Sequence, residues 1–172
     1  VAVDATRHAV VSAWRRQGTL QFKRFDVAPT SVDPTLASSL VLAASGTDGP
    51  ALVGISGSRV VVAVMIARNL VVRRSGDGGA SFAAAQTLLQ GDIDCCFIAV
   101  PNSLDVRGDR VLLEGARVFG DFSGGASLQR RFVSTDGGAH WSKVKLGNTG
   151  TRVSAWSGSG GTPRIVEAWD DA

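Results

Sequence analysis

Ser75-Gly76-Asp77-Gly78-Gly79-Ala80-Ser81-Phe82 is an eight-residue stretch that returns 59 positions later as Ser134-Thr135-Asp136-Gly137-Gly138-Ala139-His140-Trp141. Both copies place a serine, an aspartate, a glycine and an aromatic residue at the same spacing. Serine and aspartate side chains hydrogen-bond to nearby backbone and close turns. Glycine permits left-handed backbone that a Cβ opposes. Each copy therefore predicts a tight turn, and we expect the aromatic ring to be buried under its hairpin.

Outward from this motif, the chain consists of longer repeats that begin with an arginine and a mainly apolar run. The four arginines are 52, 51 and 54 residues apart: Arg7, Arg59, Arg110 and Arg164. A short apolar stretch precedes each run, and further stretches follow it. The strands expected from this pattern are 1–3, 7–14, 20–25, 52–55, 59–65, 70–74, 83–89, 104–106, 110–116, 128–133, 143–146, 153–156 and 164–169.

Short β-branched runs separated by Gly, Asn, Asp and Ser predict an all-β fold. Four strands in a unit of about 50 residues are typical of a propeller blade, whereas a solenoid coil has about 20–30. The units predicted within one domain are 1–45, 46–91, 92–148 and a half unit 149–172. A β-sandwich contains similar strands but requires no fixed period. The one helical signal is Asp33-Pro34, which predicts a short helical turn through Ala37.

Composition excludes several classes of protein. The 172 residues are 44% hydrophobic and 19% charged, which predicts a folded domain and not a disordered chain. The longest apolar run, Val60 to Ala67, is far shorter than the about 20 residues of a membrane span. The net charge is only +3 with basic and acidic residues interspersed, which argues against a nucleic-acid partner.

The cysteines and histidines predict no metal site and no cofactor. Cys95 and Cys96 are adjacent, and only His8 and His140 are available as further soft ligands. A structural zinc ion requires four ligands brought together. We therefore expect the two cysteines to be ordinary thiols, packed as small apolar side chains.

The repeated motif resembles the Asp-box, or bacterial neuraminidase repeat, which reads Ser/Thr, any residue, Asp, any residue, Gly, two residues and an aromatic. The matching residues are Ser75, Asp77, Gly79 and Phe82, then Ser134, Asp136, Gly138 and Trp141. The resemblance implies a sialidase-like β-propeller of about six blades. It also implies that the boxes lie at the blade periphery, away from the active site, so that both aspartates are structural.

Counted as blades, the chain supplies about three and a half, roughly half of such a ring. We therefore expect another chain, or residues beyond this segment, to complete the propeller. The resemblance further implies a secreted or cell-envelope bacterial protein.

Two functions follow from the resemblance. Sialidases use a tyrosine nucleophile, and the chain contains no tyrosine, so we predict no catalytic residue. The preferred hypothesis is a non-catalytic module that binds a glycan or a protein through its loops. The alternative is a fragment of a sialidase-like glycoside hydrolase whose catalytic tyrosine lies outside this chain.

The equivalent arginines are the candidate ligand-binding residues. Arg7, Arg59, Arg110 and Arg164 could converge on the ring axis and bind an anion. The alternative is that each begins a strand and reaches solvent.

Other candidate residues are carboxylates and tryptophans in apolar surroundings. Glu114 and Glu167 are candidates for a glycosidase carboxylate pair. The alternative is that each faces outward or pairs with an arginine such as Arg117. The tryptophans Trp14, Trp156 and Trp169 lie at strand ends, where they could stack on a sugar or pack in the core.

Overall fold

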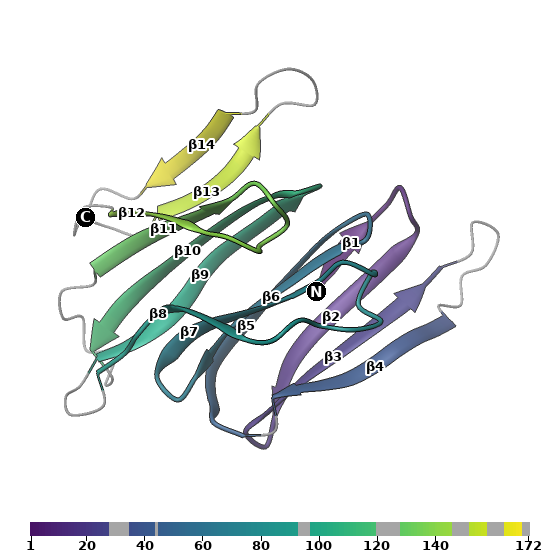
Figure 1. Ribbon diagram of the computed structural model, residues 1–172, viewed down its shortest axis with the longest axis horizontal. Coiled ribbons are helices and arrows are strands. Elements are labelled where there is room, and N and C mark those ends of the chain that lie inside the picture. The colour runs from purple at the N-terminus through teal and green to yellow at the C-terminus, as the bar shows by residue number, and fades with distance from the viewer. Residues whose placement is uncertain are drawn as a thin grey trace.

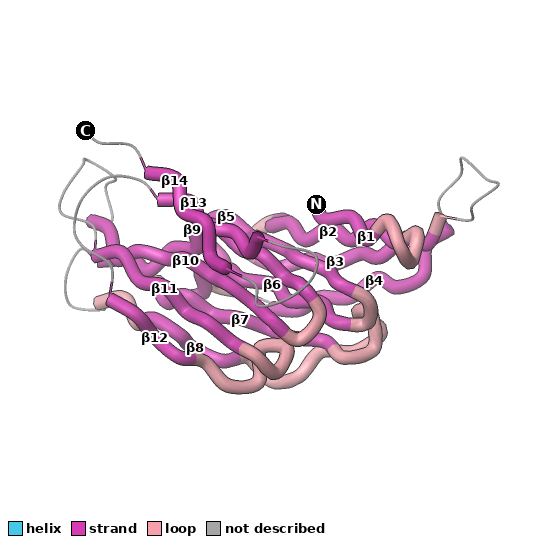
Figure 2. Tube along the Cα trace, turned by 90° about the horizontal axis from the view of Figure 1, so that it is seen from above, coloured by secondary structure: helices cyan, strands magenta, loops and turns pink. Residues whose placement is uncertain are grey.

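The computed structural model describes residues 1–27, 35–43, 45–92, 97–119, 128–145, 152–157 and 164–169. Within these ranges every regular element is a β-strand (Figures 1 and 2). Among the described residues there is accordingly no helix that could cross a membrane. The all-β prediction is confirmed.

The strands form antiparallel sheets in which each strand pairs with its neighbour in sequence (Figure 1). Sheet 1 has the order β1-β2-β3-β4, with β1 (Ala2–Asp4), β2 (Ala9–Arg16), β3 (Thr19–Asp26) and β4 (Thr35–Ala43). Sheet 2 has the order β5-β6-β7-β8, with β5 (Thr47–Ser56), β6 (Arg59–Ile66), β7 (Asn69–Ser75) and β8 (Gln86–Leu89).

Sheet 3 repeats this order with β9 (Phe97–Arg107), β10 (Arg110–Phe119), β11 (Leu128–Ser134) and β12 (Ser142–Lys145). Sheet 4 is a hairpin of β13 (Arg152–Ser157) and β14 (Arg164–Trp169). The strands of the four sheets fall within the four units expected from the sequence. The described part of the chain contains three four-stranded sheets, and none of them closes on itself.

The sheets pack face to face in chain order, with sheet 2 in the middle of the first three (Figures 1 and 2). Strand β6 contacts both neighbours: Val60, Val62 and Val64 pack against sheet 1, whereas Val61 and Ala63 pack against sheet 3. All five side chains are fully buried. Since successive strand residues point to opposite faces, a strand covered on both faces must be apolar throughout. This explains why Val60–Ala67 is the longest apolar run in the sequence.

The predicted helical turn through Ala37 is wrong. Asp33 and Pro34 lie outside the described residues, but Thr35–Ala43 forms strand β4 and pairs with β3. Leu42 is buried in the core between sheets 1 and 2, and Leu40 packs against it. This burial and the ladder hydrogen bonds outweigh a local capping signal of about 1 kcal/mol.

The strand expected at 7–14 begins later than predicted. Arg7 and His8 lie in the turn between β1 and β2, and His8 has a φ of 50°. The other three arginines of the repeat do begin strands β6, β10 and β14. Cys95 and Cys96 lie outside the described residues, so their predicted role as ordinary thiols stays a prediction.

Candidate functional site

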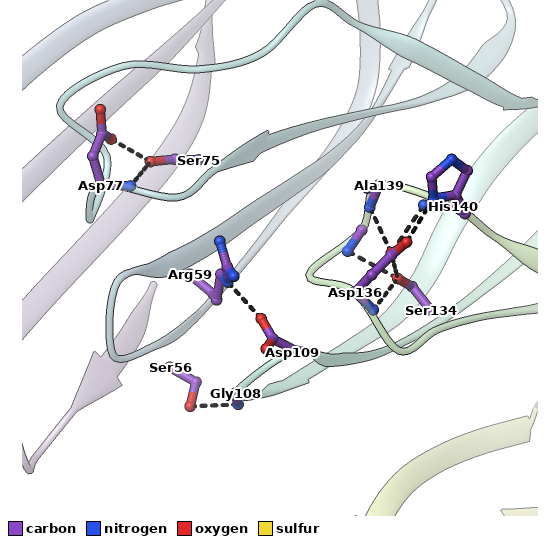
Figure 3. Close-up of polar contacts among 11 residues, drawn as sticks. Ser56, Arg59, Ser75, Asp77, Gly108, Asp109, Ser134, Asp136, Ala139 and His140 are labelled. Atoms are coloured by element: carbon purple, nitrogen blue, oxygen red, sulfur yellow. Dashed lines mark hydrogen bonds and ion pairs between the residues drawn. The ribbon is translucent and has the colours of Figure 1, made fainter.

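Motif loop 1 (residues 75–82) is a turn held together by its own serine and aspartate (Figure 3). The Ser75 hydroxyl donates to Asp77 Oδ1 at 2.6 Å and accepts from the Gly79 amide at 2.8 Å. Asp77 Oδ1 also accepts from the Ser81 amide at 2.9 Å, and Oδ2 accepts from the Ser81 hydroxyl at 2.5 Å. Gly78 and Gly79 have φ values of 74° and 93°, the left-handed region that glycine tolerates.

Motif loop 2 (residues 134–141) repeats this network (Figure 3). Ser134 Oγ lies 2.8 Å from Asp136 Oδ1 and accepts from the Gly138 amide at 2.9 Å. Asp136 Oδ1 accepts from the amides of Ala139 and His140 at 3.0 and 2.9 Å. His140 Nδ1 lies 2.6 Å from Asp136 Oδ2. Each loop is therefore closed by its own hydrogen bonds, and the serine and aspartate play the same part in both.

These contacts hold the pKa of both carboxyls well below the usual range. For Asp77 the largest cause is the hydrogen bond from the Ser75 hydroxyl, and for Asp136 it is the hydrogen bond from the His140 amide. A general acid requires a pKa near the working pH. Both aspartates are therefore ionised acceptors at neutral pH, unsuited to donating a proton.

Each motif loop is attached to the sheet that precedes it. In motif loop 1, the Phe82 ring meets Phe22 of β3 edge to face at a centroid distance of 4.9 Å. Arg24 of β3 donates to the Gly78 carbonyl at 2.8 Å, and Ser38 of β4 donates to the Gly79 carbonyl at 3.1 Å.

Motif loop 2 makes the corresponding attachment to sheet 2. Trp141 packs against the cluster that contains Val61, and its indole Nε1 donates to the Gly138 carbonyl at 3.0 Å. Gln86 of β8 donates to the Ala139 carbonyl at 3.0 Å. The sequence placed the aromatic rings under their own hairpins. Both rings pack against the preceding sheet, and Trp141 also lies against its own loop through its hydrogen bond to Gly138.

The turns between the first two strands of each sheet form a second repeated contact. Asp4 Oδ2 accepts from the Gly57 amide of sheet 2 at 2.5 Å. Ser56 Oγ accepts from the Gly108 amide of sheet 3 at 2.8 Å (Figure 3). Asp4 and Ser56 each lie three residues before a repeat arginine, and each glycine lies two residues before the next one. Equivalent residues therefore make equivalent contacts in successive sheets.

The repeat arginines lie at these turns. The Arg59 guanidinium is paired with Asp109 of the next sheet, with Nε 2.6 Å from Oδ1 (Figure 3), and it covers Gly137. The Arg7 guanidinium lies near Gly57 of sheet 2, with Nε 3.7 Å from the place that a Cβ on Gly57 would take. Arg110 is exposed at the start of β10 and has interaction partners of its own. For Arg164 the structure gives only a place at the start of β14. Ligand binding by these arginines stays a prediction.

Glu114 is fully buried on β10 and is held by Arg131 of β11. Nη2 and Nε of Arg131 lie 3.0 and 3.2 Å from Glu114 Oε1. The arginine partner is therefore Arg131 and not Arg117, because the register places Glu114 opposite Arg131. A buried carboxylate in this contact is not presented to a substrate. For Glu167 the structure describes only its place in β14, opposite Ser154.

Among the tryptophans, Trp14 is half-buried, with Lys23 Nζ 5.8 Å from its ring centroid. Trp156 and Trp169 are placed only as residues of β13 and β14. In the described ranges no group of three His, Cys, Asp or Glu side chains is close enough to hold a metal ion.

Two depressions are lined by residues of both sheet 2 and sheet 3. The proline-lined depression has a volume of about 500 Å³, and its lining includes Pro50, Leu52, Pro101, Asn102, Val118 and Gln129. The cationic depression has a volume of about 360 Å³ and is lined by Thr87, Leu88, Leu89, Gln90, Arg117 and Lys143. Sequence reasoning identified neither depression, because each collects residues from distant strands.

Comparison with models of known protein families, with curated proteins and with solved structures finds no match to this chain.

Proposed function

We propose that the chain is part of an Asp-box β-propeller, in which sheets 1, 2 and 3 are blades and sheet 4 is the inner half of the next one. The supporting observation is a repeated hydrogen bond between turns. The Asp4 carboxylate accepts from the Gly57 amide, and the equivalent Ser56 hydroxyl accepts from the Gly108 amide. In an architecture built from similar units in series, each unit makes the same contact with the next unit. The motif loops support the same proposal, because both attach to the preceding sheet.

The outward face of sheet 1 supports a further blade beyond it. Val3, Val10, Phe25 and Leu36 are paired across its four strands and form one apolar row on this face. Val3 is 63% exposed and Leu36 is 50% exposed. Because the units repeat, the outward face of β2 is equivalent to the face of β6 that packs against sheet 1. We propose that another blade of this kind, from a second chain or from further residues, covers it.

We propose that this propeller segment is a non-catalytic binding module for a glycan or a protein, with the ligand in the proline-lined depression. The motif-loop end of the sheets is occupied by framework contacts, whereas Pro50 and Val118 lie toward the other end of β5 and β10. A volume of about 500 Å³ lies within the range of about 300–1,000 Å³ typical of ligand sites. The amides of Asn102 and Gln129, joined at 3.2 Å, offer both donors and acceptors to a hydroxyl-rich ligand.

Titration with a panel of neutral and acidic glycans, followed by NMR, tests this proposal. We expect shifts confined to the lining of the proline-lined depression. Asn102→Ala should weaken binding about tenfold through one lost hydrogen bond. Ser39→Ala, an exposed change on β4, is the matched control and should leave affinity unchanged. Shifts elsewhere, or none, would refute the site. Hydrolysis of a sialyl aryl-glycoside would favour the glycoside hydrolase instead.

A further inference from the structure

The cationic depression lies between sheets 2 and 3, where β8, β10 and β12 contribute its lining. Its charged groups are the Arg117 guanidinium and the Lys143 ammonium, and no carboxylate is among the described residues that line it. In the part of the chain that the structure describes, neither cation has an ion-pair partner. Two cations that share a depression without an acid favour an anionic occupant.

Arg117 is positioned for such an occupant. Its guanidinium carbon lies 5.2 Å from the centroid of the Phe97 ring, a cation–π contact that restrains the guanidinium. Its Nε is buried and has no hydrogen-bond acceptor among the described residues. A buried donor without an acceptor is costly, and because this Nε is closed to solvent, an oxyanion in the depression gives it an acceptor only when the Arg117 side chain shifts.

The other residues that line the cationic depression indicate which chemical class of ligand it would bind. Thr87 and Gln90 offer a hydroxyl and an amide, which bind neutral oxygen groups, and Leu88 and Leu89 offer apolar contact. A depression of about 360 Å³ is larger than a lone inorganic ion requires and is near the lower limit of small-molecule sites.

We propose that the cationic depression binds the carboxylate or sulfate group of an acidic sugar, with Arg117 and Lys143 holding the anion. This site goes beyond the proposed function and is independent of it. The two depressions share no lining residue. A failure at one site therefore leaves the other untouched.

The experiment is NMR titration of the ¹⁵N-labelled protein with glucuronate, glucose 6-sulfate, glucose and sodium sulfate. We expect both acidic sugars to shift the amides of Thr87, Gln90, Arg117 and Lys143, and glucose to shift none of them. The ratio of the two affinities distinguishes a carboxylate ligand from a sulfate ligand. Because the contact is ionic, affinity should fall as sodium chloride is raised from 50 to 300 mM.

Two variants and a matched control test the assignment. Arg117→Gln should weaken binding of the acidic sugars about tenfold or more, and Lys143→Gln about threefold to fivefold. Arg117→Lys retains the charge but not the planar guanidinium, and it serves if Arg117→Gln fails to fold. Arg16→Gln removes an equal charge from an exposed position at the end of β2 and should leave affinity unchanged.

Three results would overturn the proposal. One is an absence of shifts in the cationic depression at millimolar concentrations of either acidic sugar. Another is an equal loss of affinity in Arg16→Gln, which would indicate a general effect of net charge. The third is binding of sodium sulfate as tight as that of the sugars, which would reduce the site to one for inorganic anions.

Discussion

Motif loops 1 and 2 have the same framework but end differently. In both, the serine hydroxyl joins the aspartate to a glycine amide, and two glycines take left-handed φ values. The two copies differ at the second position, Gly76 against Thr135, and at the last two positions, Ser81-Phe82 against His140-Trp141. Phe82 meets a phenylalanine of the preceding sheet, whereas Trp141 packs near Val61 and keeps a hydrogen bond to its own loop. The comparison indicates that the serine, the aspartate and the two glycines make the turn in both loops, whereas the final aromatic residue differs with the neighbouring sheet that it contacts.

The largest expected difference between the loops comes from their second glycines. A Cβ at Gly79 would lie 2.6 Å from Phe22 Cζ, whereas a Cβ at Gly138 would lie 3.3 Å from Trp141 Cζ2. Both substitutions to alanine incur left-handed strain of about 1–2 kcal/mol, and Gly79→Ala adds an overpacking cost of about 1–3 kcal/mol. Chemical denaturation of Gly79→Ala and Gly138→Ala should therefore show the larger loss in motif loop 1. Equal losses would contradict the packing difference.

The serines should behave alike in the two loops. Ser75 and Ser134 are nearly fully buried, at 3% and 2% exposed, and each satisfies the amide of a buried glycine. Ser75→Ala and Ser134→Ala should each lower the free energy of unfolding by about 1–3 kcal/mol, because that amide loses its acceptor. Ser39→Ala, at an exposed position of β4, is the control. A loss in only one loop would show that the framework is not shared.

The smallest expected effect is the pH dependence of stability, because both aspartates are largely exposed to solvent, which screens their interactions. A pKa lowered by folding gives stability that is present above the unfolded value of about 3.9 and is lost as pH falls below it. Urea unfolding between pH 7 and pH 2 should therefore show falling stability below about pH 4. Asp77→Asn and Asp136→Asn should each flatten this fall. A slope unchanged in both variants would assign the acid sensitivity to other carboxylates.

Sequence reasoning succeeded where local pattern and tertiary environment agree. The runs 59–65 and 70–74 predicted strands, and β6 and β7 occupy nearly the same residues. In these strands β-branched residues favour extended backbone, and burial on both faces of the sheet favours the same residue types. Because both faces of β6 are apolar, the sequence of the run 59–65 does not show which neighbouring sheet each side chain packs against.

Sequence reasoning failed where a residue distant in the sequence determines the local structure or the contact. The helical signal through Ala37 gave way to pairing of β4 with β3. Glu114 acquired Arg131 because the β10–β11 register places the two opposite each other. The register follows from packing of the whole sheet, so the arginine nearest in sequence was the wrong choice.

The sequence by itself determined the all-β class, the four-strand period and the turn-forming motif, because all three rest on local backbone preference and residue spacing. Only the tertiary structure decided what lies across each interface between sheets: Phe22 against Phe82, Asp109 against Arg59, and Arg117 beside Lys143 in one depression. Those contacts join residues from separate sheets or strands. The contacts between different sheets exist only after the sheets stack, because burial of apolar faces, which is not directional, brings them together.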